Sequence, residues 1–196
     1  FGSQTQQDRF LPDLISGKYT GAFALTEPDT GSDAAAIRPR AEKVNGGYKL
    51  NGAKQFITSG KIAGVAMIYA VTDPSAGKKG ISGFIVPTDT PGYHVDKVEH
   101  KLGLAASDTC AIRFEDMVVG EDALLGTEGG GLSMALSNLE AGRIGIAAQC
   151  IGMARAALDI AIAYAKERKS MGEFIIRHQA VGFRLADLAA KLMAAE

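Results

Sequence analysis

The sequence predicts an α+β fold, in which an antiparallel β-barrel domain is followed by the first helices of an α-helical bundle. Three observations predict it. Between about residues 20 and 119, short apolar runs alternate with turn sequences at the density of a barrel or a sandwich. This pattern ends at "GTEGGG" (126–131). From Leu132 onward, apolar residues recur at helical spacing and Gly and Pro become rare.

The elements follow in order. A short helix over residues 6–15, with a break at Pro12, precedes the β domain. "NGG" (45–47) between two alternating runs predicts a hairpin. We expect about seven or eight short strands in all. Those with a clear pattern are 23–26, 38–44, 48–58, 65–72, 80–87 and 111–119.

The helical part opens with some 35 residues from Leu132 in which apolar positions follow i, i+3, i+4 spacing. This predicts one long helix or two nearly collinear ones. "KSMGEFIIR" (169–177) interrupts the pattern, and a second helix begins at His178.

Composition excludes several classes of protein. The 196 residues carry a formal net charge of −1, so there is no basic face for a nucleic acid. Two cysteines without C-x-x-C spacing predict free thiols in a reducing cytoplasm. No apolar run approaches the roughly 18 residues of a membrane span. His94, His100 and His178 lack the spacing of metal ligands, so we expect no metal site.

Two motifs fail on inspection. "GTEGGG" lies between a strand and a helix, but Leu132 stands where a P-loop has its Lys, and the dinucleotide-binding glycine pattern fails as well. "SAGK" (75–78) matches S-x-x-K in a polar turn instead of at a helix start.

"FALTEPDTGSDAAA" (23–36) takes a strand end directly into a turn of carboxylates and hydroxyls. Such a turn is either an ordinary surface turn or a cradle for a polar ligand, and the segment alone leaves both open.

Four segments together decide the matter. "ALTEPDTGSD", "NGAKQFITSG", "KLGLAASDTCAIRFEDMVV" and "ERKSMGEFIIRHQAV" resemble, in order and at family spacing, the signatures of the acyl-CoA dehydrogenases. The resemblance runs over the whole chain. It implies residues 1–19 as the end of an N-terminal helical domain, 20–127 as the middle β-barrel domain, and 128–196 as the first two helices of a truncated C-terminal helical domain. Because the chain starts at Phe1 and stops inside a helical pattern, we expect it to be part of a longer polypeptide.

The resemblance implies FAD as cofactor. In that family an acyl-CoA thioester loses its α-proton and passes the β-hydrogen as hydride to flavin N5. Backbone N–H groups at the end of a strand, freed by Pro28 and Gly31, could reach the pyrimidine edge of the flavin ring. Positions 168 to 179 match residues that hold FAD across a subunit interface, where a guanidinium suits a pyrophosphate. The implied cofactor-binding residues are Phe23, Leu25, Thr26, Phe56, Ile57, Thr58, Arg168, Ser170, His178 and Gln179.

For the substrate, the resemblance implies contacts with acyl-CoA from Ser32, Lys78, Glu140 and Arg143. Without it, Lys78 is equally well a solvated turn residue. A minority of the family carries the catalytic base just before the arginine that matches Arg143, and Gly142 stands there. We therefore expect no catalytic base in this chain, with Arg143 in a supporting role and the base beyond residue 196. Ala105 replaces an arginine of many relatives.

The leading interpretation is therefore an FAD-dependent acyl-CoA dehydrogenase, inactive as this chain alone. Its electrons would pass to an electron-transferring flavoprotein. We expect a homotetramer built as a dimer of dimers, in the bacterial cytoplasm or, in a eukaryote, the mitochondrial matrix. An acyl-CoA oxidase or flavin monooxygenase on the same scaffold, or a non-redox β-barrel binding module, remain as alternatives.

Overall fold

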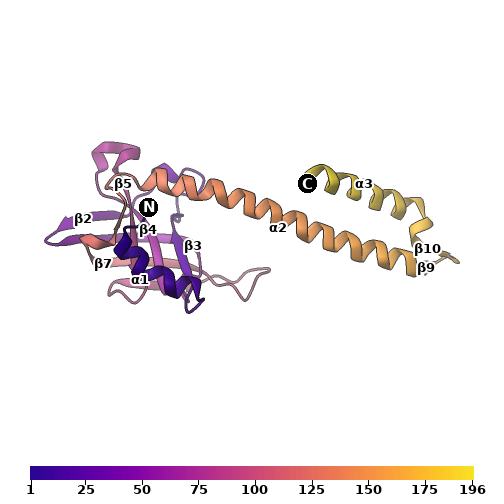
Figure 1. Ribbon diagram of the computed structural model, residues 1–196, viewed down its shortest axis with the longest axis horizontal. Helices are drawn as coiled ribbons and strands as arrows, with labels where there is room; N and C mark the ends of the chain where they lie inside the picture. Colours follow the sequence, from indigo (N-terminus) through magenta and orange to yellow (C-terminus); the bar gives the residue numbers. More distant parts are fainter. The chain divides into compact units, whose positions relative to one another are not determined.

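The computed structural model describes all 196 residues, which form two compact units, Phe1–Ser137 and Asn138–Glu196 (Figure 1). Unit 1 contains a sheet of eight strands and one helix. The strands are β1 Gly21–Ala24, β2 Arg40–Val44, β3 Gly47–Thr58, β4 Val65–Val71, β5 Ile81–Pro87, β6 Tyr93–Val98, β7 Thr109–Gly120 and β8 Leu124–Leu125. Four short 3-10 helices are η1 Ala34–Ala36, η2 Pro74–Gly80, η3 Glu121–Ala123 and η4 Ile175–Arg177.

The sheet is mixed and open, which corrects the predicted antiparallel barrel. Its strand order is β6-β7-β3-β2-β4-β5-β8, and β1 is attached to β4 outside this path. β1 runs parallel to β4 and pairs with Val65 to Ile68, so β2 shares the same edge of β4 through only one pair, Arg40 with Val71. Alternation in a sequence gives the faces of a strand, but neither the direction of its neighbour nor closure of the sheet. The α+β class itself is confirmed.

Two clusters form the core of unit 1. The larger packs between the long strands and includes Leu50, Ile68 and Phe84, all with 0% of their surface exposed. The rings of Tyr48 and Phe84 meet edge to face with centroids 5.0 Å apart. The smaller cluster includes Leu25, Tyr69 and Leu132, and thereby joins the end of β1 to the start of the long helix.

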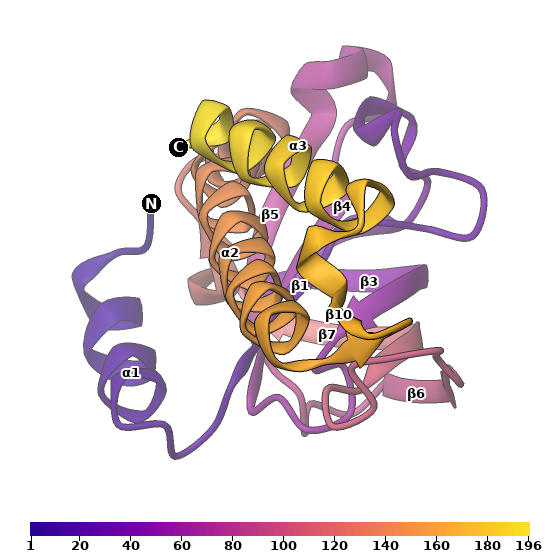
Figure 2. The same cartoon turned by 90° about the vertical axis from the view of Figure 1, so that its right-hand side faces the viewer.

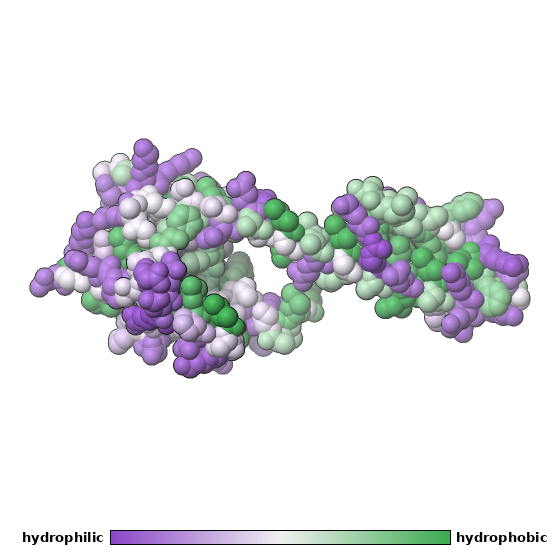
Figure 3. All heavy atoms as spheres, in the orientation of Figure 1, coloured by the Kyte–Doolittle hydropathy of each residue, from purple (hydrophilic) through white to green (hydrophobic).

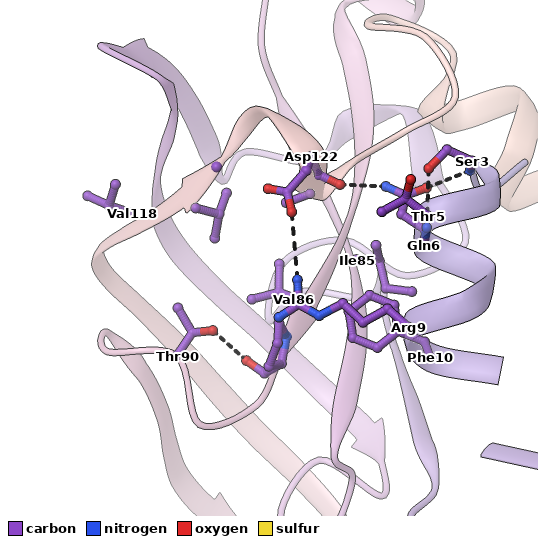
Figure 4. A pocket seen from close by; sticks show the side chains of 14 residues that line it. Ser3, Thr5, Gln6, Arg9, Phe10, Ile85, Val86, Thr90, Val118 and Asp122 are labelled. Carbon is purple, nitrogen blue, oxygen red and sulfur yellow. Dashed lines mark hydrogen bonds and ion pairs between the residues drawn. The ribbon is translucent and has the colours of Figure 1, made fainter. Parts of the chain in front are cut away.

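Helix α1 (Gln4–Ile15) begins with a capping box between Ser3 and Gln6. The amide of Gln6 also donates to the carbonyl oxygen of Asp122 at 2.7 Å (Figure 4) and to that of Leu124 at 2.9 Å. These bonds attach α1 to η3 and to β8. A break was expected at Pro12, but the helix continues through it to Ile15. Pro12 lacks a backbone N–H and so removes only one hydrogen bond of the helix.

Unit 2 is a pair of helices that lie side by side (Figures 1 and 2). Helix α2 (Gly131–Glu167) begins in unit 1 and is one helix, as predicted in the simpler of the two forms. A two-stranded turn, β9 Lys169–Ser170 and β10 Glu173–Phe174, leads to α3 (Gln179–Ala195), whose N-cap is His178. A cavity lined by Ala154, Leu158, Leu188 and Leu192 lies between the two helices.

Large apolar side chains also cover the outside of unit 2 (Figure 3). Ile144, Ile160, Phe183 and Met193 are each more than two-thirds exposed, at 74%, 71%, 68% and 75%. A helix that is apolar on all sides is normally buried. By length and composition alone α2 would also suffice to cross a membrane, although the sequence pattern predicted no membrane span.

Candidate functional site

The chain leaves β1 at Ala24 and enters the polar turn. The turn is closed by two backbone hydrogen bonds, from Glu27 N to Thr30 O at 2.8 Å and from Thr30 N to Glu27 O at 3.2 Å. Glu27 is only 6% exposed, although it lies in a turn. The turn is therefore more than a solvated connection.

A buried ion pair explains the burial of Glu27. Lys54 of β3 is 0% exposed, and its Nζ donates to Glu27 Oε1 at 2.8 Å and to the carbonyl oxygen of Leu25 at 3.0 Å. The other carboxylate oxygen of Glu27 accepts from the backbone N–H of Arg38 at 2.9 Å. The charged groups of both side chains are thus satisfied within the protein.

Burial lowers the pKa of Lys54 from 10.5 to about 8, because the charged form loses its hydration, and the carboxylate of Glu27 opposes this shift. In the folded protein Lys54 therefore loses its proton at a pH at which an unfolded lysine keeps it.

This has a consequence for stability. Between about pH 8 and 10.5 the unfolded state binds more protons at Lys54 than the folded state, so the contribution of Lys54 to stability rises with pH. Relative to a Lys54→Met/Glu27→Leu variant, the free energy of unfolding of the full-length protein should increase on the order of 3 kcal/mol across this window. Urea unfolding of both proteins between pH 7 and 10.5 measures it. A constant difference would show that Lys54 does not titrate there.

Directly after Lys54, strand β3 carries a β-bulge. Lys54 pairs with Ile112 and Ile57 with Cys110, so Gln55 and Phe56 together oppose the single residue Ala111. Phe56 has a φ of 57° and is 62% exposed. A bulky residue in the left-handed region is strained by about 1 to 3 kcal/mol, and such strain gathers at functional sites.

The bulge also separates the three predicted residues of this segment. Phe56 and Thr58 are exposed, and no protein group bonds the hydroxyl of Thr58. Ile57, in contrast, is 2% exposed and belongs to the core. Its predicted role in cofactor binding is therefore left to its backbone, because the bulge turns the neighbours outward and the side chain of Ile57 inward.

The end of β1 lies next to this bulge. The backbone N–H of Gln55 donates to the carbonyl oxygen of Thr26 at 2.8 Å. Phe23 and Leu25 point into the smaller core cluster, where the rings of Phe23 and Tyr69 lie 5.2 Å apart. Phe23 also lines an apolar cavity of about 500 Å³ between α1 and the sheet, with Phe10, Leu14 and Met67. Thr26 is half-buried.

The two predicted substrate residues of unit 1 are both on the surface. Ser32 is exposed in the turn that follows Thr30. Lys78 is exposed in η2, and no carboxylate pairs with it. They leave a hydroxyl and an ammonium group free for a polar ligand.

In unit 2, the predicted residues around the β9–β10 turn come together. A ring nitrogen of His178 lies 3.1 Å from the carbonyl oxygen of Ser170. Arg168, one residue before β9, is exposed and forms no ion pair, whereas Arg177 nearby pairs with Glu173 at 3.3 Å. Gln179 is exposed at the first position of α3. The arrangement offers an unpaired guanidinium one residue before β9, and a guanidinium suits an anion.

Glu140 and Arg143 lie elsewhere on α2. Both are exposed, and no ion pair joins them. From Arg143 to Glu167 the helix rises about 36 Å at 1.5 Å per residue. Within one copy of unit 2, the structure therefore does not bring this pair to the Arg168 cluster.

The sequence analysis missed the two buried residues that support the site, Glu27 and Lys54. Glu27 and Lys54 stand in two of the quoted motifs, but neither received a role. A signal existed, since Lys54 occupies an inward position of a strand that otherwise buries Tyr48 and Leu50. A lysine there predicts a buried partner carboxylate.

Unit 1 thus presents an exposed aromatic ring, free hydroxyls and an unpaired ammonium group, and unit 2 by itself presents an unpaired guanidinium. The ring and the adjoining apolar end of β1 suit a flat aromatic ligand. The free guanidinium suits a phosphate. These are the binding groups that a large dinucleotide-like cofactor needs.

Comparison with known proteins agrees with this chemistry. The family description "Acyl-CoA dehydrogenase, middle domain" matches residues 22–117, and "Acyl-CoA dehydrogenase, C-terminal domain" matches residues 129–196. The whole of α2 lies within the second match. The chain is 49% identical over 195 residues to an acyl-CoA dehydrogenase of Bacillus subtilis and 46% identical to a subunit of the caffeyl-CoA reductase–Etf complex of Acetobacterium woodii.

Solved structures give the same result. Butyryl-CoA dehydrogenase from Megasphaera elsdenii matches with a TM-score of 0.95 and 41% identity, covering 99% of this chain and 51% of that one. PigA, solved with FAD and proline, matches with a TM-score of 0.95 and 35% identity, covering 99% and 51%. The chain spans about half the length of the curated relatives it matches, 52% of the Bacillus and Acetobacterium proteins.

Proposed function

Because the chain belongs to the acyl-CoA dehydrogenase family, we propose that it is part of an FAD-dependent enzyme that oxidises the Cα–Cβ bond of an acyl-CoA thioester. The observation that carries the proposal is the strained, exposed Phe56 beside the end of β1. Strain and exposure of a large aromatic ring are both unfavourable in the chain by itself, and a flat ligand that covers the ring offsets the exposure.

Each group of residues has a task. Phe56 and Phe23 provide apolar surface for the ring system, and the backbone of Leu25 and Thr26 borders it. Thr58 offers a hydroxyl to the reactive edge. When bound, FAD supplies a two-electron acceptor for hydride. The apolar side chains around the ring, among them Phe56 and Phe23, would exclude water from the site.

The Arg168 cluster serves the phosphates. Ser170, His178 and Gln179 complete it, and we propose that it holds the cofactor of a neighbouring copy. Such an exchange needs at least two copies, and we propose a homotetramer built as a dimer of dimers.

Substrate binding is assigned to Ser32, Lys78, Glu140 and Arg143. All four are exposed, as contacts to a long phosphorylated thioester require. The general base is not among them. Gly142, at the position where some relatives carry a base, has no side chain, so the carboxylate that removes the α-proton comes from outside residues 1–196.

The partners follow from the same chemistry. We propose that an electron-transferring flavoprotein accepts the electrons, since one relative is named as a subunit of a complex with such a protein. Further helices of the C-terminal domain would cover the apolar surface of α2, which makes a bundle helix of it instead of a membrane span. A bacterial cytoplasm or a mitochondrial matrix suits such an enzyme.

The test is the visible absorption spectrum of the purified full-length protein, recorded without oxygen before and after addition of an acyl-CoA. We expect an oxidised flavin spectrum that bleaches. Absence of flavin, even after reconstitution with FAD, would overturn the proposal and favour a binding module without redox chemistry. Oxygen consumption during turnover would instead favour an oxidase or a monooxygenase, and the likeness to PigA, solved with proline, keeps a substrate other than acyl-CoA as the second candidate.

Thr58 gives a further prediction. Thr58→Val keeps the shape of the side chain and removes its hydroxyl. We expect kcat to fall about threefold to tenfold while FAD stays bound, which is the value of one neutral hydrogen bond. Steady-state kinetics measure it. Thr109→Val, the cross-strand neighbour on β7, is the matched control and should stay within about twofold of the wild type. An equal loss in both variants would remove the proposed role.

A further inference from the structure

The buried pair of Lys54 and Glu27 has no task in the binding of cofactor or substrate described above. Neither side chain reaches the surface, at 0% and 5% side-chain exposure. All their polar partners are internal: the Leu25 carbonyl for Lys54, the Arg38 backbone N–H for Glu27, and each other.

Such a pair is a poor source of stability. Moving two charges out of water is so unfavourable that apolar residues of similar size are often equally stable in their place. Removing one partner is strongly destabilising, because the other charge is then buried alone. Stability alone therefore does not explain why a lysine and a glutamate occupy these positions.

The position of the pair does offer an explanation. In the sheet, β1 pairs only with β4, and β3 pairs with β2 and β7. No ladder of strand hydrogen bonds therefore joins the end of β1 to the bulge of β3. The connection consists of two adjacent residues of β3: the ammonium of Lys54 binds the carbonyl oxygen of Leu25, and the N–H of Gln55 binds that of Thr26.

This connection determines the distance between the two halves of the candidate cofactor face. One half is the backbone of Leu25 and Thr26. The other is Phe56 with Thr58, which begins two residues after Lys54. The carboxylate of Glu27 accepts from the N–H of Arg38 with one oxygen and from the ammonium of Lys54 with the other, and so holds the ammonium in place.

We propose that Lys54 and Glu27 are positioning residues, which fix the end of β1 against the bulge of β3 and so hold the two halves of the cofactor-binding face at the separation that the flavin ring requires. The proposal rests on the proposed function, since it needs FAD at this face. The two residues touch neither cofactor nor substrate and act through Leu25, Thr26 and Phe56.

The experiment compares three variants of the full-length protein with the wild type. Lys54→Met leaves Glu27 buried without a partner. Lys54→Met/Glu27→Leu removes both charges and thereby the unpaired one. Lys43→Met is the control, because Lys43 on β2 forms an exposed ion pair with Glu128 at 2.7 Å. For each protein, three quantities are measured: the melting temperature of the flavin-free form, the Kd for FAD, and the visible circular dichroism of the bound flavin.

If the pair has a positioning role, the effects on FAD binding and on thermal stability will differ between the single and the double variant. We expect the single variant to lose both thermal stability and FAD affinity. In the double variant the melting temperature should return close to that of the wild type, while the Kd for FAD stays weaker by about tenfold or more and the circular dichroism stays altered. Lys43→Met should match the wild type in all three.

The outcomes are distinguishable. A double variant with the Kd and circular dichroism of the wild type would overturn the positioning role and leave the proposed function intact. A wild-type protein that takes up no FAD after reconstitution would overturn both. If the double variant does not fold, the isosteric variant Glu27→Gln is measured in its place. A weaker Kd for FAD and an altered circular dichroism spectrum would support the positioning role, and wild-type values would overturn it.

Discussion

Gly80→Ala is expected to lower the free energy of unfolding by about 3 kcal/mol or more. Gly80 ends η2 and is buried, and its carbonyl oxygen accepts from the backbone N–H groups of Thr72 and Asp73, at 2.8 and 3.2 Å. A Cβ at this position would overlap the carbonyl oxygen of Asp73. Because the position of a Cβ is fixed by the backbone and the carbonyl oxygen belongs to the backbone, no change of rotamer relieves the overlap, and the connection between β4 and β5 has to open.

The urea midpoint of the full-length protein measures this effect. Gly103→Ala is the matched control, since a Cβ at Gly103 meets open space and should change stability by less than about 0.5 kcal/mol. We also expect Gly80→Ala to weaken acyl-CoA binding, because η2 carries Lys78. Equal midpoints for the two variants would contradict the overlap.

Arg168→Ala is expected to weaken FAD binding by about tenfold to a hundredfold, the loss that follows when a charged hydrogen-bond donor to a phosphate is removed. The guanidinium of Arg168 forms no ion pair within the protein, so its removal leaves no carboxylate without a partner. The melting temperature of the flavin-free protein should therefore stay unchanged. Equilibrium dialysis or fluorescence titration of the full-length protein with FAD gives the Kd.

Arg177→Ala provides the comparison, because Arg177 lies in the same turn region but pairs with Glu173 at 3.3 Å. Its Kd for FAD should remain within about twofold of the wild type. The affinity of the wild type should also fall more steeply with salt than that of Arg168→Ala, since one phosphate contact is lost in the variant. Identical affinities for the two variants would remove Arg168 from the phosphate site.

Much of the fold could be predicted from the sequence. The hairpin at residues 45–47, the long strand 48–58 and the switch to helices after Gly131 are all found in the structure. These features are local, since turn residues and periodicity determine them. Closure of the sheet and the parallel position of β1 on β4 depend on contacts between distant residues, which local patterns do not contain. β6 also escaped location, because its burial is too slight to impose a regular alternation of apolar residues.

The candidate site divides in the same way. Motif positions predicted which segments meet, and the structure does bring the end of β1 to the segment after Lys54. Motifs cover whole segments, however, and do not show which side chain in a segment faces outward. Ile57 was included for that reason and is buried. Glu27 and Lys54 were left out because they lie 27 residues apart in the chain, and only the fold shows that they bind each other.

The bulge in β3 changes which residues of the strand face the core. Before it, even-numbered residues such as Tyr48, Leu50 and Lys54 are buried, and after it the odd-numbered Ile57 is. An uninterrupted strand would turn Phe56 and Thr58 into the core and Ile57 to the outside. One extra residue thus converts a stretch of interior into a ligand-facing wall. Deletion of Gln55 would remove the bulge and still leave Phe56 and Thr58 on the outer face, because the residue that follows the inward Lys54 in a regular strand points outward.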